Sequence, residues 1–156
     1  MKANQTIRKL SPHQLSLAVQ YATGAQHLPT RAQLRRWIKV ALQHDASITL
    51  RIVDEPEGRE LNKKYRGKDY ATNVLTFVYD SAKPLNGDIV ICAPVVKREA
   101  TEQHKDLLAH YAHLTIHAVL HLQGYGHDAD VDAVKMETLE TALMLKLRYP
   151  DPYLAI

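Results

Sequence analysis

The sequence is poor in several residue types and patterns, and each shortage excludes a class of protein. With a single cysteine in 156 residues, the chain cannot form an intrachain disulfide, and it lacks the thiolates that close most structural zinc sites. No apolar run approaches the roughly 20 residues that cross a bilayer. The polar N-terminal residues lack the apolar core of a secretion signal. We therefore expect a cytoplasmic protein that does not enter a membrane.

The length and the apolar content bound the architecture. The chain is 46% hydrophobic, which suffices for one domain with a real core, and it is too short for two ordinary domains. It contains no internal repeat or low-complexity tract. We expect a single domain over residues 1–156, in which residues 1–12 form a mobile leader.

Hydrophobic patterns predict strands mainly in the first part of the chain and helices in the last. A helix is predicted to begin with a capping box at Thr30 and Gln33. The last helix is predicted to turn five apolar residues inward: Val131, Val134, Leu139, Ala142 and Leu143. The order of elements predicts an α+β fold with a small mixed sheet of about four strands covered by helices. Strands are expected at 15–21, 48–52, 74–79 and 88–92, and the later helices at 57–65, 94–103, 106–123 and 131–147.

Three histidines surround a glycine-rich break in the C-terminal third. His117 and His121 are four residues apart on the predicted helix 106–123, so their β-carbons lie about 5 to 6 Å apart on one face. Gly124 and Gly126 end that helix, because glycine reaches left-handed dihedral angles at little cost. The chain can then turn back and bring His127 to the same ion. The segment predicts a three-histidine metal site on a buried core helix.

The spacing of these histidines matches that of the metzincin zinc proteases, His-Glu-x-x-His-x-x-Gly-x-x-His. One position differs, because Ala118 stands where a metzincin carries its general base. The single cysteine, Cys92, lies in a predicted buried strand and is expected to be a core residue. Three histidines without thiolates favour one catalytic Zn²⁺ with an open position for water, although manganese, iron and nickel also bind imidazole.

The other histidines are not expected to bind the ion. His113 shares the helical stripe of His117 and His121, but the outer two of these three lie about 12 Å apart, too far to share one ion. His110 and His113 precede the motif on the same helix and are expected to be hydrogen-bonded structural residues. The alternative is that they support the metal ligands or contact substrate. The remaining four are interpreted as solvated polar residues: His13, His27, His44 and His104.

Charge is unevenly distributed along the chain. Residues 1–105 contain 17 Lys and Arg against 10 Asp and Glu, whereas residues 106–156 contain 3 against 7. Basic clusters can attract phosphate backbones, but on charge alone an ordinary solvated surface is the better interpretation. Two clusters stand out: Arg31, Arg35, Arg36 and Lys39, then Lys63, Lys64, Arg66 and Lys68.

Three blocks of sequence together resemble a known family. The segments 61–77 (LNKKYRGKDYATNVLTF), 87–89 (GDI) and 117–127 (HAVLHLQGYGH) are similar to those of the bacterial YbeY endoribonucleases, the rRNA maturation factors. The resemblance implies a zinc-dependent, single-strand-specific endoribonuclease that acts in 16S rRNA 3′-end maturation and ribosome quality control. Its implied partners are single-stranded RNA of the 16S precursor, the small ribosomal subunit and assembly factors.

The resemblance also implies roles for individual residues. The family's metal histidines correspond to His117, His121 and His127, and its functionally important arginine to Arg66. Gly126 departs from the family, which commonly has Asp before the last histidine, so a carboxylate that could tune the metal is missing there.

These roles combine into a hypothesis for the reaction and leave two alternatives. A metal-activated water would attack the phosphodiester, and Arg66 would stabilise the phosphate charge, with no side chain assigned to proton transfer. A metalloprotease would need a carboxylate from outside the motif. A non-catalytic assembly factor would use the metal only to brace the glycine-rich turn, so that losing a ligand would lower stability and leave assembly activity intact.

Overall fold

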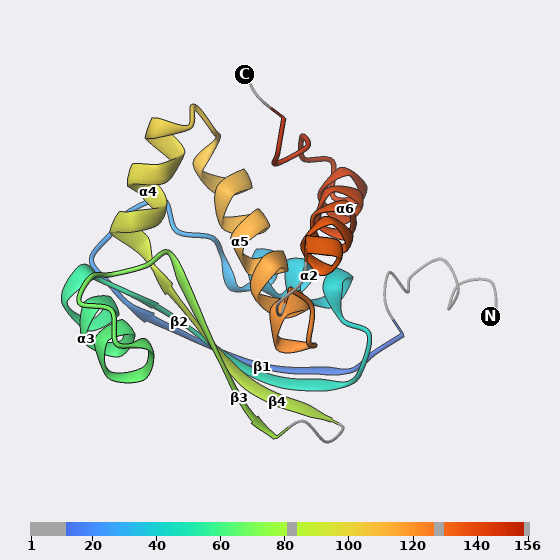
Figure 1. The fold of residues 1–156 in the computed structure, drawn as a ribbon, viewed down its shortest axis with the longest axis horizontal. Coiled ribbons are helices and arrows are strands. Elements are labelled where there is room, and N and C mark those ends of the chain that lie inside the picture. Colours follow the sequence, from blue (N-terminus) through green and yellow to red (C-terminus); the bar gives the residue numbers. More distant parts are fainter. Residues whose placement is uncertain (1–11, 81–83, 127–129, 155–156) are drawn as a thin grey trace.

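The computed structural model describes residues 12–80, 84–126 and 130–154, so nearly all of the expected leader lies outside the described residues. Within these ranges the chain forms four strands and five helices (Figure 1). In chain order they are β1 (Leu15–Ala22), α2 (Arg31–Ala41), β2 (Ala46–Val53), α3 (Glu55–Arg66), β3 (Val74–Asp80), β4 (Leu85–Cys92), α4 (Ala93–Glu102), α5 (Leu107–Leu122) and α6 (Asp130–Lys146).

The strands form one mixed sheet in the order β1-β2-β4-β3. β1 and β4 both pair in parallel with β2, and β3 pairs antiparallel with β4 at the edge of the sheet. β3 and β4 follow each other in the sequence, whereas helices lie in the sequence between the parallel neighbours, as parallel pairing requires. The predicted α+β fold with a four-stranded mixed sheet is confirmed.

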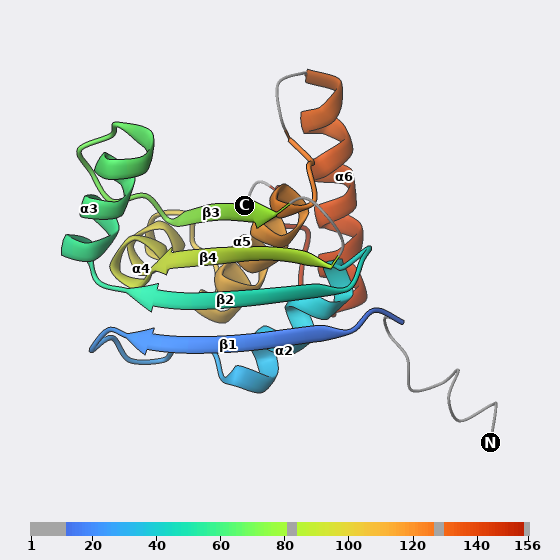
Figure 2. The ribbon, with the colours of Figure 1, turned by 90° about the horizontal axis from the view of Figure 1, so that it is seen from below.

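Helices cover one face of the sheet, and α3 lies beside one end of it (Figures 1 and 2). Alternate residues of β4 divide the core, because successive side chains of a strand point to opposite faces. Ile89 and Ile91 join the main core with α5 and α2, whereas Val90 and Cys92 join a smaller cluster against which Leu61 of α3 packs. The expectation that Cys92 is a core residue is confirmed.

Helix α5 runs through the main core. Most of its residues are buried, and Asp106 caps its N-terminus by accepting a hydrogen bond from the Ala109 N–H. A β-carbon at Gly87 of β4 would lie 2.8 Å from the Phe77 carbonyl oxygen and 3.1 Å from Leu122 Cδ2. A glycine at this position lets the C-terminal end of α5 approach the sheet closely.

Two details of the predicted helices were tested by the structure. Thr30 and Gln33 form the predicted capping box at the start of α2. The inward face predicted for α6 is confirmed in part. Leu139 and Leu143 pack against the main core, whereas Val134 is 63% exposed and Ala142 is exposed as well. The side chain of Val131 lies outside the described residues. The buried positions follow a stripe four residues apart through Met136, Glu140 and Met144. Apolar residues occur on every side of this helix, so their periodicity does not fix which side faces the core.

None of the described helices is long and apolar enough to cross a membrane.

Candidate functional site

An open cleft of about 500 Å³ lies between the C-terminal end of α3, strand β3 and helix α5. It brings together three residues that the sequence singled out: Arg66 from α3, and His117 and His121 from α5. The other lining residues carry hydroxyl, amide, aromatic or apolar side chains: Tyr65, Thr72, Asn73, Val74, Leu75, Thr76 and Phe77.

Arg66 is the last residue of α3, and the local sequence fixes that end. Gly67 adopts a left-handed conformation with φ of 71°, and its N–H donates to the Lys63 carbonyl at 3.1 Å. A left-handed glycine is the usual helix C-cap, because it has no β-carbon to strain. The loop that follows Gly67 is held by Asn62 of α3, whose Nδ2 donates to the Tyr70 carbonyl at 2.7 Å. Arg66 is thereby held, exposed, at the rim of the cleft.

The residues that lead into β3 are held by a chain of polar side chains. Asn73 Oδ1 accepts the Val74 N–H at 2.7 Å, and Asn73 Nδ2 donates to the Glu99 carboxylate of α4 at 3.1 Å. His110 Nε2 lies 2.9 Å from the same carboxylate. Burial lowers the pKa of His110, although Glu99 opposes that shift. His110 is therefore a structural residue, as the sequence analysis expected.

The two described histidines of the motif lie side by side on α5. Their ring planes are nearly parallel, at 11°, with centroids 6.2 Å apart. The predicted glycine turn follows, with φ of 100° at Gly124 and 82° at Gly126. Gly126 has a backbone conformation that residues with a β-carbon rarely adopt, so an aspartate at this position would strain the turn.

The third predicted ligand, His127, lies outside the described residues. Among residues 12–80, 84–126 and 130–154, no three His, Cys, Asp or Glu side chains converge as a group that could hold a metal ion. The three-histidine ligand set therefore stays a prediction.

A buried carboxylate that the sequence analysis did not single out supports the histidines from behind. Glu140 of α6 is fully buried and has three polar partners. Its Oε2 lies 3.0 Å from His117 Nδ1, and its Oε1 lies 2.5 Å from His113 Nε2. The Tyr153 hydroxyl donates to Oε1 at 2.6 Å. One carboxylate thus ties α5 and the C-terminal residues to α6.

The charge of Glu140 follows from these contacts. Burial raises the pKa of the carboxyl, but the hydrogen bonds from His113, His117 and Tyr153 lower it more, to about 2. Burial and the adjacent carboxylate raise the pKa of Tyr153, so its hydroxyl stays protonated and donates. An ionised Glu140 can only accept, so His117 donates its Nδ1 proton to the carboxylate, and Nε2 is the ring nitrogen left for another partner.

The donor set of this structure fits a metal ion. Metal-binding histidines generally donate their second ring N–H to a carboxylate or carbonyl, which fixes the tautomer and the ring orientation. His117 has this arrangement with Glu140. The sequence could have indicated that Glu140 is buried. It lies four positions from both Met136 and Met144, so the three residues share one face of the helix, and two of them are apolar.

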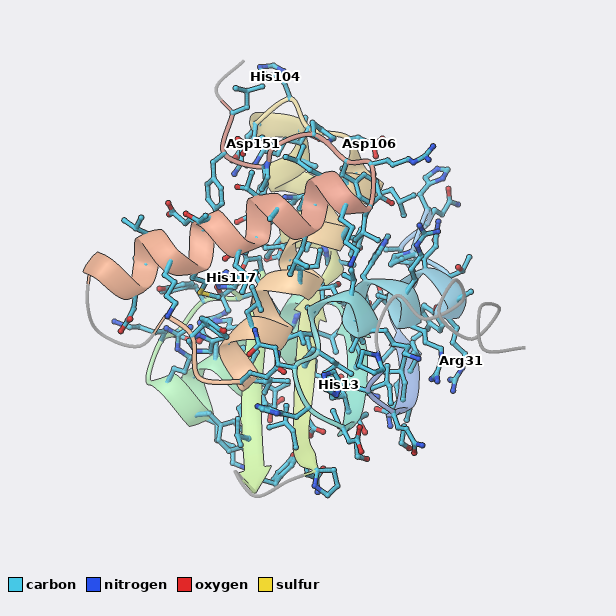
Figure 3. All side chains as sticks on the ribbon, turned by 90° about the vertical axis from the view of Figure 1, so that its right-hand side faces the viewer. His13, Arg31, His104, Asp106, His117 and Asp151 are labelled. Atoms are coloured by element: carbon cyan, nitrogen blue, oxygen red, sulfur yellow. The ribbon has the colours of Figure 1, made fainter. Side chains whose placement is uncertain are left out.

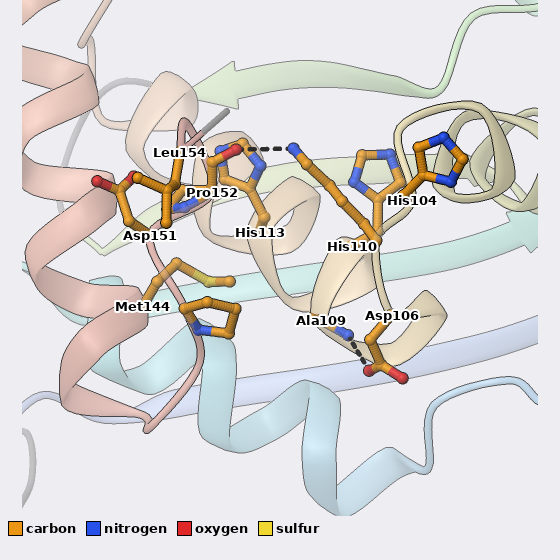
Figure 4. Close-up of a pocket in the computed structure, with 11 residues that line it drawn as sticks. His104, Asp106, Ala109, His110, His113, Met144, Asp151, Pro152 and Leu154 are labelled. Carbon is orange, nitrogen blue, oxygen red and sulfur yellow. Dashed lines mark hydrogen bonds between the residues drawn. The ribbon is translucent and has the colours of Figure 1, made fainter. Parts of the chain in front are cut away.

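The C-terminal residues cover the N-terminal part of α5, before His117. Lys105 Nζ donates to the Pro152 carbonyl at 2.7 Å, beside a mostly apolar cavity of about 130 Å³ that His110 and His113 also line (Figure 4). Glu140 is fully buried behind these residues, and His113 is 9% exposed.

The fold and the site define a class: a small α+β protein in which one cleft joins a helix-borne pair of imidazoles to an arginine at the end of another helix. Comparison with known proteins gives the family. Residues 19–148 match the family model described as Endoribonuclease YbeY, and the chain belongs to this family.

Individual relatives agree with this assignment. A protein named Endoribonuclease YbeY from Nitrosospira multiformis is 59% identical, and the alignment covers 91% of this chain and 83% of the relative. One of the same name from Thiobacillus denitrificans is 58% identical over 90% of this chain and 97% of the relative. The solution structure of a Thermotoga maritima protein matches with a TM-score of 0.54 and 24% identity over 88% of this chain and 99% of that one, which supports the fold.

Proposed function

We propose that this protein is a zinc-dependent endoribonuclease that cuts single-stranded RNA, with His117, His121 and His127 as the metal ligands and Arg66 as the phosphate-binding residue. The observation that carries the proposal is that Arg66, His117 and His121 line one cleft although they come from two helices far apart in the sequence. The names of the relatives, which are endoribonucleases, support RNA as the substrate.

The proposed chemistry divides between the metal and the chain. A zinc ion held by these imidazoles would lower the pKa of bound water towards about 7 and so would supply a nucleophile at neutral pH. The Glu140 carboxylate holds the His117 ring in the orientation and tautomer that a metal ligand needs. Ala118 stands where a metzincin carries its general base; it is buried and its methyl group cannot accept a proton. We therefore assign no general base to the chain.

Arg66 is suited to the phosphate by its chemistry and its position. Guanidinium is permanently charged and planar, and it can donate two parallel hydrogen bonds to phosphate oxygens. It is the cationic residue among the described lining of the cleft. A peptide substrate gains little from such a group, so the cleft favours phosphodiester cleavage over proteolysis.

The biological setting is proposed from the family. The enzyme would trim the 3′ end of the 16S rRNA precursor and act in ribosome quality control, in contact with the small subunit and assembly factors in the cytoplasm. Single-stranded substrate agrees with an open cleft, because unpaired RNA leaves its bases and backbone free to bend into it.

Replacing His121 by alanine tests the metal site. The His121→Ala protein should lose bound zinc and RNA cutting together, because two imidazoles hold an ion far more weakly than three. Zinc content, the melting temperature in a chelator and cleavage of a short single-stranded RNA would be measured on the same preparations. The variant should melt near the wild type once both are metal-free. Undiminished cutting by folded, metal-free His121→Ala protein would contradict the proposal, and normal assembly activity without cutting would favour the assembly-factor alternative.

Replacing Glu140 by glutamine tests the support of His117 without touching a ligand. Loss of a carboxylate that orients a metal-binding histidine costs about 10- to 100-fold in metal affinity. The Glu140→Gln protein should therefore bind zinc about 10-fold or more weakly in a competition titration. Glu137→Gln is the matched control, because Glu137 is exposed on the same helix. Equal zinc affinity in the two variants would show that Glu140 serves the fold alone.

A further inference from the structure

A second groove, of about 240 Å³, adjoins the cleft on the other side of Phe77. The two hollows share Tyr65 and Phe77 as lining residues, so they lie next to each other at the edge strand β3. We call this second hollow the aromatic groove. It is lined by Arg51, Glu57, Leu61, Tyr65, Phe77, Tyr79, Asp88 and Val90.

Three aromatic side chains line the groove: Tyr65, Phe77 and Tyr79. Tyr65 and Phe77 meet edge to face, with centroids 5.1 Å apart and planes at 67°. Tyr79 is 65% exposed and Tyr65 is 56% exposed, although aromatic side chains of this size usually bury most of their surface. The Tyr79 hydroxyl donates to the Asp88 carboxylate, which fixes the tyrosine side chain at the groove. Exposed and fixed aromatic rings are the surfaces on which single-stranded nucleic acids stack their bases.

The charges of the aromatic groove determine which part of a nucleotide it accepts. Arg51 is already neutralised, because its guanidinium makes two hydrogen bonds to Glu57, at 2.7 and 3.0 Å. Asp88 adds a negative charge, so the groove repels phosphate. An uncharged nucleobase meets no such penalty, and its amino groups can donate to carboxylate oxygens.

Positive charge lies beside the aromatic groove at the end of α3. Lys63, Lys64 and Arg66 are exposed there, and Lys64 Nζ sits 5.2 Å from the centroid of the Tyr65 ring. The backbone of a strand bound in the cleft can follow these cations while a neighbouring base turns into the groove. Basic residues that interleave with aromatic rings are typical of single-strand binding.

We propose that the aromatic groove binds an unpaired nucleobase of the RNA strand whose phosphate lies at Arg66, with Tyr65 and Tyr79 as its stacking surfaces. This inference rests on the proposed function, because it takes RNA as the substrate of the cleft. A base in a duplex is already stacked and paired, so the groove also gives the enzyme a reason to select single strands.

Leucine and phenylalanine substitutions separate stacking from simple apolar contact. Stacking of one base on an aromatic ring contributes enough affinity that Tyr79→Leu should weaken binding of a short single-stranded RNA about five- to tenfold. Tyr79→Phe keeps the ring and loses only its hydrogen bond to Asp88, so it should weaken binding less than Tyr79→Leu, by about two- to threefold. Tyr21→Leu removes an exposed tyrosine from β1 at the opposite edge of the sheet and should stay within about twofold of wild type. Binding would be measured by fluorescence anisotropy on the full chain with a chelator present, and cutting with zinc restored.

Abasic RNA identifies the occupant of the groove. We would measure a series of RNAs, each of which lacks one base. At one position the loss of the base should weaken binding to wild type. Tyr79→Leu should bind that abasic RNA as well as wild type does, because the two changes remove the same contact. Binding by Tyr79→Leu that equals wild type for every RNA would overturn the inference, as would a loss that is the same for intact and all abasic RNAs. Failure of wild type to cut RNA with zinc would instead overturn the proposed function, so the two failures are distinguishable.

Discussion

Helices α2 and α3 each carry a cluster of basic residues, and the structure uses the two clusters differently. In α2, Arg31 Nη2 donates to the Leu17 carbonyl at 2.7 Å, and Arg35 Nη1 donates to the Leu15 carbonyl at 3.1 Å. Both carbonyls belong to β1, an edge strand whose outer backbone groups no other strand pairs. The arginines of α2 therefore close an open edge, which protects it from pairing with another chain.

Within the described residues, the cations of α3 donate no hydrogen bond to the edge of a strand. Lys63, Lys64 and Arg66 occupy the last turn, where the negative end of the helix dipole favours cations. None of the three makes an ion pair with a carboxylate within the part of the chain that the structure describes. Arg66 lies in the same cleft as His117, whereas Figure 3 shows Arg31 well apart from His117, across the molecule.

The difference shows that a count of basic residues says little about phosphate binding. Two clusters of four cations look alike in the sequence, and the neighbouring backbone decides their roles. An unpaired strand edge binds the arginines of α2, while a helix end beside a polar cleft leaves those of α3 available to a substrate.

Charge reversal at one arginine of each helix gives the largest expected effect. Arg66→Glu should lower RNA cutting by at least about 100-fold, because it replaces a donor to the phosphate by a group that repels it. Arg36→Glu is the matched control, since Arg36 is exposed on α2. It should change cutting by no more than about twofold at moderate salt. Initial rates on single-stranded RNA at saturating zinc would be compared.

Two further measurements test whether a loss of cutting comes from a loss of metal or of folding. The zinc content and melting temperature of Arg66→Glu should equal those of wild type, because Arg66 is exposed and contacts no histidine of the motif in the described structure. Similar losses of cutting in both variants would mean that net charge, and not the position of Arg66, attracts the RNA.

The sequence predicted much of the fold, because local patterns determine most of it. The four strands and five helices lie where alternation, helical periodicity and capping residues placed them, within a few residues at the ends. The inward face of α6 was predicted only in part, for a physical reason: Leu139 and Leu143 face the core, but Val134 does not. Val134 and Leu145 are large apolar residues on the exposed side of this helix, so the pattern pointed in several directions at once.

The candidate site was predictable only in part. The four-residue spacing of His117 and His121 predicts their common helix face, and the structure places both in the cleft with Arg66. Glu140 reaches His117 only through the packing of α6 on α5, which no local pattern encodes. The aromatic groove needs α3 beside β3 and β4, so its tyrosines look like ordinary exposed residues in the sequence.

The smallest expected effect tests the α2 half of the comparison. Replacing Arg31 and Arg35 together by methionine keeps most of the side-chain length and removes two hydrogen bonds to the edge of β1. Because both arginines are largely exposed, the free energy of unfolding should fall by only about 1 to 2 kcal/mol. For a chain of this size that corresponds to roughly 4 °C in melting temperature. RNA cutting below the transition should not change. A loss of cutting with full stability would mean that α2 also binds the substrate, and that the two basic helices are less different than their contacts indicate.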